Sequence, residues 1–376
     1  MNCKRLQLHN FKNFLEADIQ LHPKINFFVG DNGVGKTNLM DAIHYLSFCK
    51  SFYNNSDQLN IRHLADYFAI HGFFDDVNVQ DNVHVGCILK QNSRKVFKLN
   101  KKEYPRMADH IGLIPLVMVS PYDVDLINQG SEHRRRYFDG VVSQFDRLYL
   151  EDLINYNKVL QQRNVLLKTM AEQHRFDINS IQIWDMQMIE IGQRIHQRRS
   201  AFLKNLKPVF QEYYNFLTNG KEEIDIEYQS QINNRDYADV LSEAIEKDRY
   251  AQYSTVGIHK DDYVFLMNNY PVKRFGSQGQ QKSFLMALKL AQFSYTFQVK
   301  NVKPLLLLDD IFDKLDENRV SKIIELAGDG KLGQVFISDT HMDRIEKLFA
   351  RLDLPYKCFQ ISDNQILEIN SRHDGK

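Results

Sequence analysis

The sequence is poor in cysteine and has no long apolar run. Its 376 residues include four cysteines, and none of them stands in the C-x-x-C spacing typical of metal or redox sites. This scarcity argues against a disulfide framework or a zinc site and favours a reducing, cytoplasmic compartment. The first residues, MNCKRLQLHNFKN, contain no apolar segment of a signal peptide. The longest apolar runs have the length of strands, so we expect no membrane span and no membrane partner.

The sequence also lacks an excess of charge of either sign. Lysine and arginine total 48, aspartate and glutamate total 48, and the net charge at neutral pH is therefore zero. A surface covered in positive charge is excluded. A local basic stripe, which binding to nucleic acid backbones requires, is compatible with this balance.

Apolar patterning changes twice along the chain. Residues 1–125 carry short apolar or alternating runs typical of strands, and residues 126–254 carry helical spacing. From 255 to 376, strand-like runs alternate with helical ones, which indicates parallel strands. We therefore expect an α/β head in two halves, 1–125 and 255–376, separated by a helical insertion at 126–254.

The strongest motif is GDNGVGKT, Gly30 to Thr37. It fits G-x-x-x-x-G-K-[ST], follows the strand-like run INFFV and precedes a helical pattern, which is the setting of a phosphate-binding loop. In such a loop the backbone N–H groups and the helix N-terminus surround phosphate oxygens, the lysine reaches the β- and γ-phosphates, and the threonine hydroxyl binds Mg²⁺. The predicted nucleotide-binding residues are Gly30, Asp31, Asn32, Gly33, Val34, Gly35, Lys36, Thr37 and Asn38.

A second candidate site follows the four leucines of KPLLLLDD. The leucines predict a strand buried on both faces, and an acid at its carboxyl end can hold the water shell of Mg²⁺. Asp309 is the candidate for Mg²⁺. Asp310 is the candidate for orienting or deprotonating the attacking water, with Lys36 as the other catalytic residue. The alternative is a buried strand followed by an aspartate that caps a helix.

A third stretch, GSQGQ from Gly276 to Gln280, precedes another apolar-striped helix. Ser277 offers a hydroxyl, Gly279 permits close approach of another backbone, and the helix N-terminus favours an anion. Taken alone, Ser277 fits an ordinary helix N-cap.

Together these motifs resemble the ABC-type ATPases of the SMC/Rad50 class and, in size and detail, the RecF family. The resemblance covers nearly the whole chain and includes LQLHNFKNF, SPYDVDLINQGSEHRRRYFD and LDDIFDKLDENR. It implies an ABC-type ATPase head of two lobes with mixed sheets, with ATP and Mg²⁺ as ligands. It also implies that Ser277, Gly279 and Gln280 cap the γ-phosphate of ATP held by a second molecule, which makes an ATP-dependent homodimer.

The resemblance points to further positions, some with alternatives. Asp316 stands in the expected D-loop at the dimer seam, and His341 either takes the place of the class's switch histidine or caps a helix. Asp123 or Gln129 takes the place of the glutamine that senses the γ-phosphate. Lys12 either lies near the nucleotide or, as the favoured interpretation, is an exposed lysine.

The activity that the resemblance implies is slow ATP hydrolysis that switches a grip on DNA. ATP would join two heads over duplex DNA near a junction with single-stranded DNA, in recombination and replication-gap repair. The implied partners are RecR and RecO, and the implied outcome is the loading of RecA. Candidate DNA contacts are basic residues of the insertion, namely Arg134, Arg135, Arg163, Arg194 and Arg198. Within HRRRYFD, the structural alternative pairs Arg135 or Arg136 with Asp139.

Two other functions share part of these motifs. An SMC-like ATPase of phage defence has the same head but usually appends an effector domain, for which the short stretch after the last expected helix leaves no room. A small-molecule kinase has a phosphate-binding loop, but it keeps its second motif much closer than Asp309 stands to Lys36. The kinase also gives no role to GSQGQ.

Overall fold

The chain folds into two compact units. The computed structural model describes residues 1–76, 80–220, 222–311, 317–342, 344, 354–362 and 365–372. One unit comprises Met1–Asp123 and Leu285–Lys376, and the other comprises Val124–Phe284. Each unit is described by itself below.

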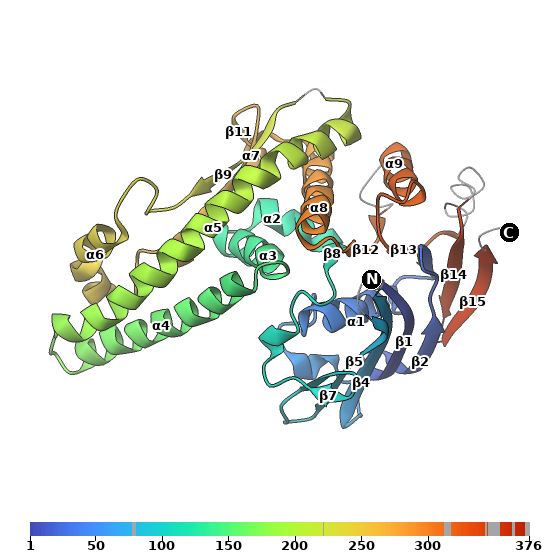
Figure 1. The fold of residues 1–376 in the computed structure, drawn as a ribbon, viewed down its shortest axis with the longest axis horizontal. Coiled ribbons are helices and arrows are strands. Elements are labelled where there is room, and N and C mark those ends of the chain that lie inside the picture. The colour runs from blue at the N-terminus through green and yellow to red at the C-terminus, as the bar shows by residue number, and fades with distance from the viewer. Residues whose placement is uncertain are drawn as a thin grey trace. The chain divides into compact units, whose positions relative to one another are not determined.

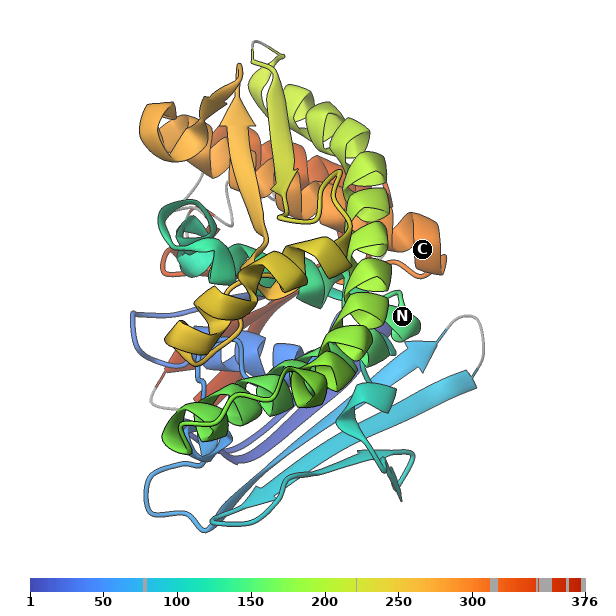
Figure 2. The ribbon, with the colours of Figure 1, turned by 90° about the vertical axis from the view of Figure 1, so that its left-hand side faces the viewer.

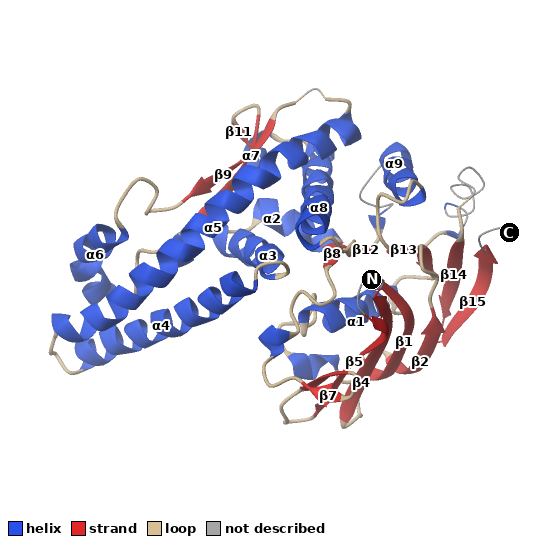
Figure 3. Cartoon of the chain, viewed as in Figure 1, coloured by secondary structure: helices blue, strands red, loops and turns tan. Residues whose placement is uncertain are grey.

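The first unit contains an antiparallel sheet of six strands in the order β2-β1-β4-β5-β6-β7. One face of this sheet is buried and the other is accessible, which explains the alternating patterns of the N-terminal region. Strands of this unit appear in red in Figure 3. The bounds are β1 (Asn2–Phe11), β2 (Phe14–Gln20), β4 (Tyr67–Asp76), β5 (Gln80–Lys90), β6 (Val96–Leu99) and β7 (Lys102–Glu103).

A second six-stranded sheet of the same unit has the order β15-β14-β3-β13-β12-β8. Five of its strands run parallel, and only β15 is antiparallel to its neighbour. The carboxyl ends of the parallel strands therefore meet at one edge. The bounds are β3 (Ile25–Val29), β8 (Leu116–Val119), β12 (Leu305–Leu308), β13 (Val335–Asp339), β14 (Tyr356–Ser362) and β15 (Gln365–Arg372).

Helix α1 (Lys36–Phe48) joins the two sheets through a single apolar core. Its Leu39, Ile43 and Leu46 are fully buried and belong to the same cluster as Leu6 of the antiparallel sheet and Phe28 of the parallel sheet. Burial of such side chains contributes about 1.5–3 kcal/mol each. The loop that precedes α1 is consequently held on a rigid support. Further helices in the described part of this unit are η1 (Asp57–Asn60), η2 (Met107–Asp109), η3 (Pro121–Val124, which ends at the start of the second unit) and α9 (Glu317–Gly328).

The second unit is built on a long helical hairpin. Helices α4 (Arg147–Glu172) and α5 (Ile178–Thr218) lie side by side in Figures 1 and 2. Each begins at an aspartate whose side chain accepts a backbone N–H, Asp146 for α4 and Asp177 for α5. Its other elements are α2 (Asp125–Asn128), α3 (Ser131–Ser143), β9 (Ile224–Gln229), α6 (Tyr237–Ala251), η4 (Ile258–Lys260), β10 (Asp262–Met267), β11 (Tyr270–Pro271) and α7 (Val272–Phe275).

The second unit extends to Phe284, beyond the boundary expected at residue 254. The reason is backbone pairing, because β10 forms an antiparallel ladder with β9 and β11 pairs with β10. Helix α8 (Gln278–Lys300) begins in the second unit and continues into the first. Among the helices of the described residues, none has both the length and the apolar character needed to cross a membrane.

Candidate nucleotide-binding site

The loop between β3 and α1 requires glycine at two positions. Gly30 has φ +154°, and a Cβ there would lie 2.3 Å from the carbonyl oxygen of Ile361. Gly35 has φ +115°, and a Cβ there would lie 2.5 Å from Nδ2 of Asn13. Both the backbone conformation and the space exclude a side chain at these positions. The loop therefore has one compact conformation, with its crest at the exposed residues 31–33.

Asn13 fastens this loop to the turn between β1 and β2. Its Nδ2 donates to the carbonyl oxygen of Val34 at 2.8 Å, and its Oδ1 accepts from Nδ2 of Asn38 at 2.7 Å. In the sequence, Asn13 stood only within LQLHNFKNF, a stretch quoted for its resemblance. In the structure, Asn13 links the loop at Val34 to Asn38 of α1 through these two hydrogen bonds.

Lys36 and the start of α1 provide positive charge at the loop. The Lys36 side chain is buried, and its Nζ donates to the carbonyl oxygens of Gly30 at 2.8 Å and Asp31 at 2.9 Å. The N-cap residue of α1 is Gly35, which has no side chain that could cap the helix. Backbone N–H groups at an uncapped helix N-terminus, together with a cation, form a site for an anion such as phosphate.

Asp309 lies next to the loop although it is distant in sequence. The Thr37 hydroxyl donates to both Asp309 carboxylate oxygens, at 3.2 Å and 3.1 Å, across 272 positions. The Tyr53 hydroxyl donates to Oδ2 and the Ser338 hydroxyl to Oδ1, each at 2.6 Å. The proximity follows from the sheet, because β13 separates β3 from β12 and carries Ser338. Sequence reasoning missed Tyr53 and Ser338.

Asp310, the candidate for the attacking water, follows Asp309 in a left-handed conformation. Its φ is +47°, and its backbone N–H donates to the Ser338 hydroxyl at 2.9 Å. Aspartate tolerates this region better than most residues, and such conformations concentrate at functional sites. Asp316 lies outside the described residues. The His341 side chain is exposed, and its backbone N–H donates to Asp339 at 3.1 Å.

The expectation that Lys12 is exposed was wrong. Its side chain is 11% exposed, and Nζ lies 2.6 Å from Oδ2 of the buried Asp41. Both carboxylate oxygens of Asp123 have partners within the same unit. Lys289 Nζ lies 2.7 Å from its Oδ1, and the Ser120 N–H donates to its Oδ2. Gln129 belongs to the second unit.

The GSQGQ stretch forms a reciprocal capping box. The backbone N–H of Ser277 donates to Oε1 of Gln280 at 2.8 Å, and the N–H of Gln280 donates to the Ser277 hydroxyl at 3.2 Å. Ser277 and Gly279 are exposed, and among the described residues no atom would lie within 4 Å of a Cβ on Gly279. The capping interpretation is confirmed, and the crest of the turn is open to solvent. The role across a dimer stays a prediction.

Comparison with known proteins agrees with this geometry. A family model described as the RecF/RecN/SMC N terminal domain matches residues 2–353. The DNA replication and repair protein RecF of Phocaeicola vulgatus is 45% identical over 370 residues, which cover 98% of each chain. RecF of Flavobacterium johnsoniae is 46% identical over 364 residues, which cover 96% of this chain and all of that one. The chain belongs to the RecF family.

Solved structures support the same assignment. The recombination mediator protein RecF with ATP, described in the RecFOR pathway, is 27% identical with a TM-score of 0.89, and 98% of each chain is covered. An Smc head bound to the C-winged helix domain of ScpA has a TM-score of 0.58 at 14% identity, over 98% of each chain, which shows the fold alone. The predicted fold of an SMC-like ABC-type ATPase head is confirmed.

The basic residues predicted to contact DNA in this RecF-family chain differ in their surroundings. The prediction that Arg163 contacts DNA is corrected, because its side chain has no exposed surface and lies 2.6 Å from both Asp185 and Asp248. Arg134 is 13% exposed and forms two hydrogen bonds with Asp262, at 2.7 and 2.9 Å. Neither guanidinium presents the open face that a DNA phosphate requires.

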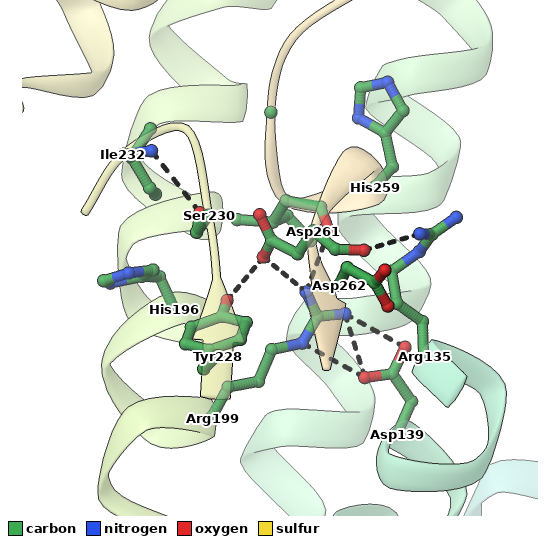
Figure 4. Close-up of polar contacts among 12 residues, drawn as sticks. Arg135, Asp139, His196, Arg199, Tyr228, Ser230, Ile232, His259, Asp261 and Asp262 are labelled. Carbon is green, nitrogen blue, oxygen red and sulfur yellow. Dashed lines mark hydrogen bonds and ion pairs between the residues drawn. The ribbon is translucent and has the colours of Figure 1, made fainter. Parts of the chain in front are cut away.

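A buried network around Arg199 explains the HRRRYFD stretch. Figure 4 shows Arg199 between Asp139 and Asp261, with nitrogen–oxygen distances of 2.9 Å to each carboxylate. The partner of Asp139 is therefore Arg199, whereas Arg135 donates to the Asp261 carbonyl oxygen at 2.6 Å. Burial raises the pKa of Asp261, and Arg199 opposes that rise. The alternative that paired Asp139 with Arg135 or Arg136 was wrong, since Arg136 pairs with Glu132.

Arg194 and Arg198 remain accessible on α5. Their side chains are 39% and 27% exposed, and both donate to Asp152 at 2.7 Å. Burial tends to raise the pKa of Asp152, but the hydrogen bonds from the two arginines leave it lower than usual. Glu190 also pairs with Arg194, and Asp146 with Arg198. Two guanidinium groups therefore face three carboxylates, and this cluster has no excess of positive charge.

Proposed function

We propose that this chain is an ATP-dependent DNA-binding protein of recombination and replication-gap repair. The observation that carries this proposal is the convergence of Thr37 and Asp309 beside a phosphate-binding loop, in a chain of the RecF family. The relative solved with ATP covers nearly the whole chain, which supports ATP as the nucleotide.

Mg²⁺ fits the oxygen groups at the loop. The Thr37 hydroxyl and the Asp309 carboxylate lie within 3.2 Å of each other, and Mg²⁺ prefers one or two such oxygen ligands together with water and substrate phosphates. When bound, Mg²⁺ neutralises charge that develops on the phosphates. Thr37 would bind the metal directly, and Asp309 would hold its water shell.

Two residues of the chain would act on the γ-phosphate. Lys36 is positioned by the Gly30 and Asp31 carbonyl oxygens, so its ammonium group is available at the loop without further ordering. Asp310 would orient or deprotonate the attacking water. Hydrolysis would be slow, because its role would be to reset a switch.

The open turn at Ser277 and Gly279 would face a second chain. Its exposed crest at the N-terminus of α8 suits the γ-phosphate of ATP bound by that chain. Two ATP molecules would then join two chains related by a two-fold axis. Asp316 and His341 are candidates for that seam.

The closed dimer would hold duplex DNA near a junction with single-stranded DNA. Contacts to phosphates would come from accessible basic residues of the second unit, with Arg194 and Arg198 as the named candidates. RecR and RecO are the proposed partners, and loading of RecA on gaps the proposed outcome. The description of a relative within the RecFOR pathway supports this placement. The setting would be the cytoplasm, which suits four buried thiols.

The test measures molecular mass by light scattering, with and without ATP and Mg²⁺. Asp310→Asn should hold ATP and double the mass. Adding Ser277→Arg to that variant should keep the mass at one chain, because the new side chain fills the open turn. Ser93→Arg, on an exposed turn of the first unit, is the matched control and should leave the doubling intact. A chain that binds ATP yet keeps the mass of one chain in every variant contradicts the dimer, and unchanged nucleotide affinity in Lys36→Ala contradicts the loop assignment.

A further inference from the structure

Tyr53 touches the carboxylate that faces the phosphate-binding loop. Its hydroxyl donates to Oδ2 of Asp309 at 2.6 Å, across 256 positions of sequence. A tyrosine hydroxyl has an ordinary pKa of about 10, so it is protonated at neutral pH and is the donor of this bond.

The segment that carries Tyr53 is anchored from α1. Asp41 is fully buried, and its carboxylate accepts the Ser51 hydroxyl at 2.6 Å and the Phe52 backbone N–H at 2.7 Å. Lys12 pairs with the same carboxylate at 2.6 Å. The bonds to Ser51 and Phe52 fix the backbone that leads from the end of α1 at Phe48 to Tyr53, and Lys12 neutralises the carboxylate that accepts them.

The ring of Tyr53 is also held on several sides. It packs edge-on against Phe52 and Tyr122, with centroids 5.1 and 5.7 Å apart. Nζ of Lys12 lies 5.4 Å from the ring centroid. Aromatic and cation–π contacts of this kind are attractive. The surrounding packing therefore helps to hold the ring with its hydroxyl directed at Asp309.

The two oxygens of Asp309 are fixed from opposite elements. Ser338 of β13 donates to Oδ1 and Tyr53 donates to Oδ2, each at 2.6 Å. Thr37 lies within 3.2 Å of both oxygens. A carboxylate with one strong donor on each oxygen has a defined plane, and its remaining lone pairs are directed toward the Thr37 hydroxyl.

We propose that Tyr53 is a positioning residue for the Mg²⁺ site, which it serves by fixing the carboxylate of Asp309. This inference rests on the proposed function. Groups that orient the residues of a metal site typically contribute about 10–100-fold to metal affinity or activity. Tyr53 acts through Asp309 and contacts neither the metal nor the phosphates in this scheme.

The experiment replaces the hydroxyl alone, with Tyr53→Phe, which keeps the ring contacts. Binding of a fluorescent ATP analogue is titrated with Mg²⁺, and binding without Mg²⁺ is measured in parallel. We expect the Mg²⁺ concentration for half-maximal binding to rise about tenfold, and affinity without Mg²⁺ to stay unchanged.

Tyr45→Phe is the matched control. Tyr45 is fully buried on α1, and its hydroxyl donates to Asp57 at 2.6 Å. Tyr45→Phe therefore removes a tyrosine–carboxylate hydrogen bond of the same length that does not involve Asp309. Its Mg²⁺ requirement should remain that of the wild type.

Three outcomes overturn the inference. If Tyr53→Phe needs no more Mg²⁺ than the wild type, Tyr53 only packs. If both variants need more Mg²⁺ to the same degree, the effect is a general loss of stability. If the wild type binds no nucleotide at any Mg²⁺ concentration, the proposed function itself fails, and the inference fails with it.

Discussion

Removal of the Arg199 guanidinium tests how the second unit is held together. Arg199 is 1% exposed and lies 2.9 Å from both Asp139 and Asp261. It also donates to the carbonyl oxygen of Ile258 at 2.8 Å. In Arg199→Met the apolar part of the side chain remains, but two carboxylates lose their cation.

The expected cost follows from what is left behind. Removing one partner of a buried ion pair costs about 3–5 kcal/mol, because the remaining charge is neither hydrated nor neutralised. With an m-value of about 2 kcal/mol per molar urea, the midpoint of unfolding should fall by about 2 M. The control is Arg136→Met, which removes an exposed ion pair. The side chains of Arg136 and its partner Glu132 are 70% and 62% exposed. It should cost at most about 1 kcal/mol.

The assay uses the only tryptophan of the chain. Trp184 lies on α5 of the second unit, so its fluorescence during urea unfolding reports that unit. A midpoint for Arg199→Met that matches the control would refute the reasoning, because it would mean that the network adds nothing to stability.

Proton binding gives this prediction a second signature. Burial raises the pKa of Asp261 and Arg199 counteracts the rise, so Arg199→Met should raise it further. A carboxyl whose folded pKa exceeds the unfolded value, about 3.9, loses stability as the pH rises through the folded pKa. The cost of Arg199→Met should therefore be smallest at acid pH, near the unfolded pKa, and should increase as the pH rises through the folded pKa of Asp261. A cost that stays constant from about pH 3.5 to pH 8 would exclude an uncompensated carboxylate as its cause.

Two further predictions concern DNA binding and acid stability. The double variant Arg194→Ala with Arg198→Ala should weaken binding to duplex DNA. It should also reduce the slope of log K against log salt concentration by about 2, because up to two phosphate contacts are lost. An unchanged slope would mean that this part of α5 does not contact DNA. Burial lowers the pKa of His44 and of His110 to about 4 each. Below about pH 6.5 these histidines bind protons in the unfolded chain but not in the folded one, so the free energy of unfolding should fall between about pH 6.5 and pH 4. The expected slope is about 1.4 kcal/mol per pH unit for each histidine. Urea unfolding followed by circular dichroism at several pH values measures this slope, and His44→Phe should reduce it. A slope that this change leaves unaffected would show that His44 does not contribute to the pH dependence of stability.

The sequence alone was sufficient where the determining interactions are local. The conformation of GDNGVGKT follows from its glycines and from the start of α1, and four consecutive leucines before two aspartates favour a short buried strand, which the structure has. The spacing of Ser277 and Gln280 likewise contains its own capping box. Each of these patterns lies within a few residues, so elementary propensities decide it.

Tertiary structure alone decided which charged and polar side chains meet. The sequence of α4 presents Arg163 as one more basic residue of a helix, yet packing buries it between two aspartates from α5 and α6. Tyr53 follows α1 with no pattern to distinguish it, and only the strand order brings Asp309 to its hydroxyl. The end of the second unit at Phe284 depends on the pairing of β10 with β9. The physical reason is the same in each case: the energy of a buried charge or a strand edge depends on partners that are distant in sequence, and no local pattern specifies them.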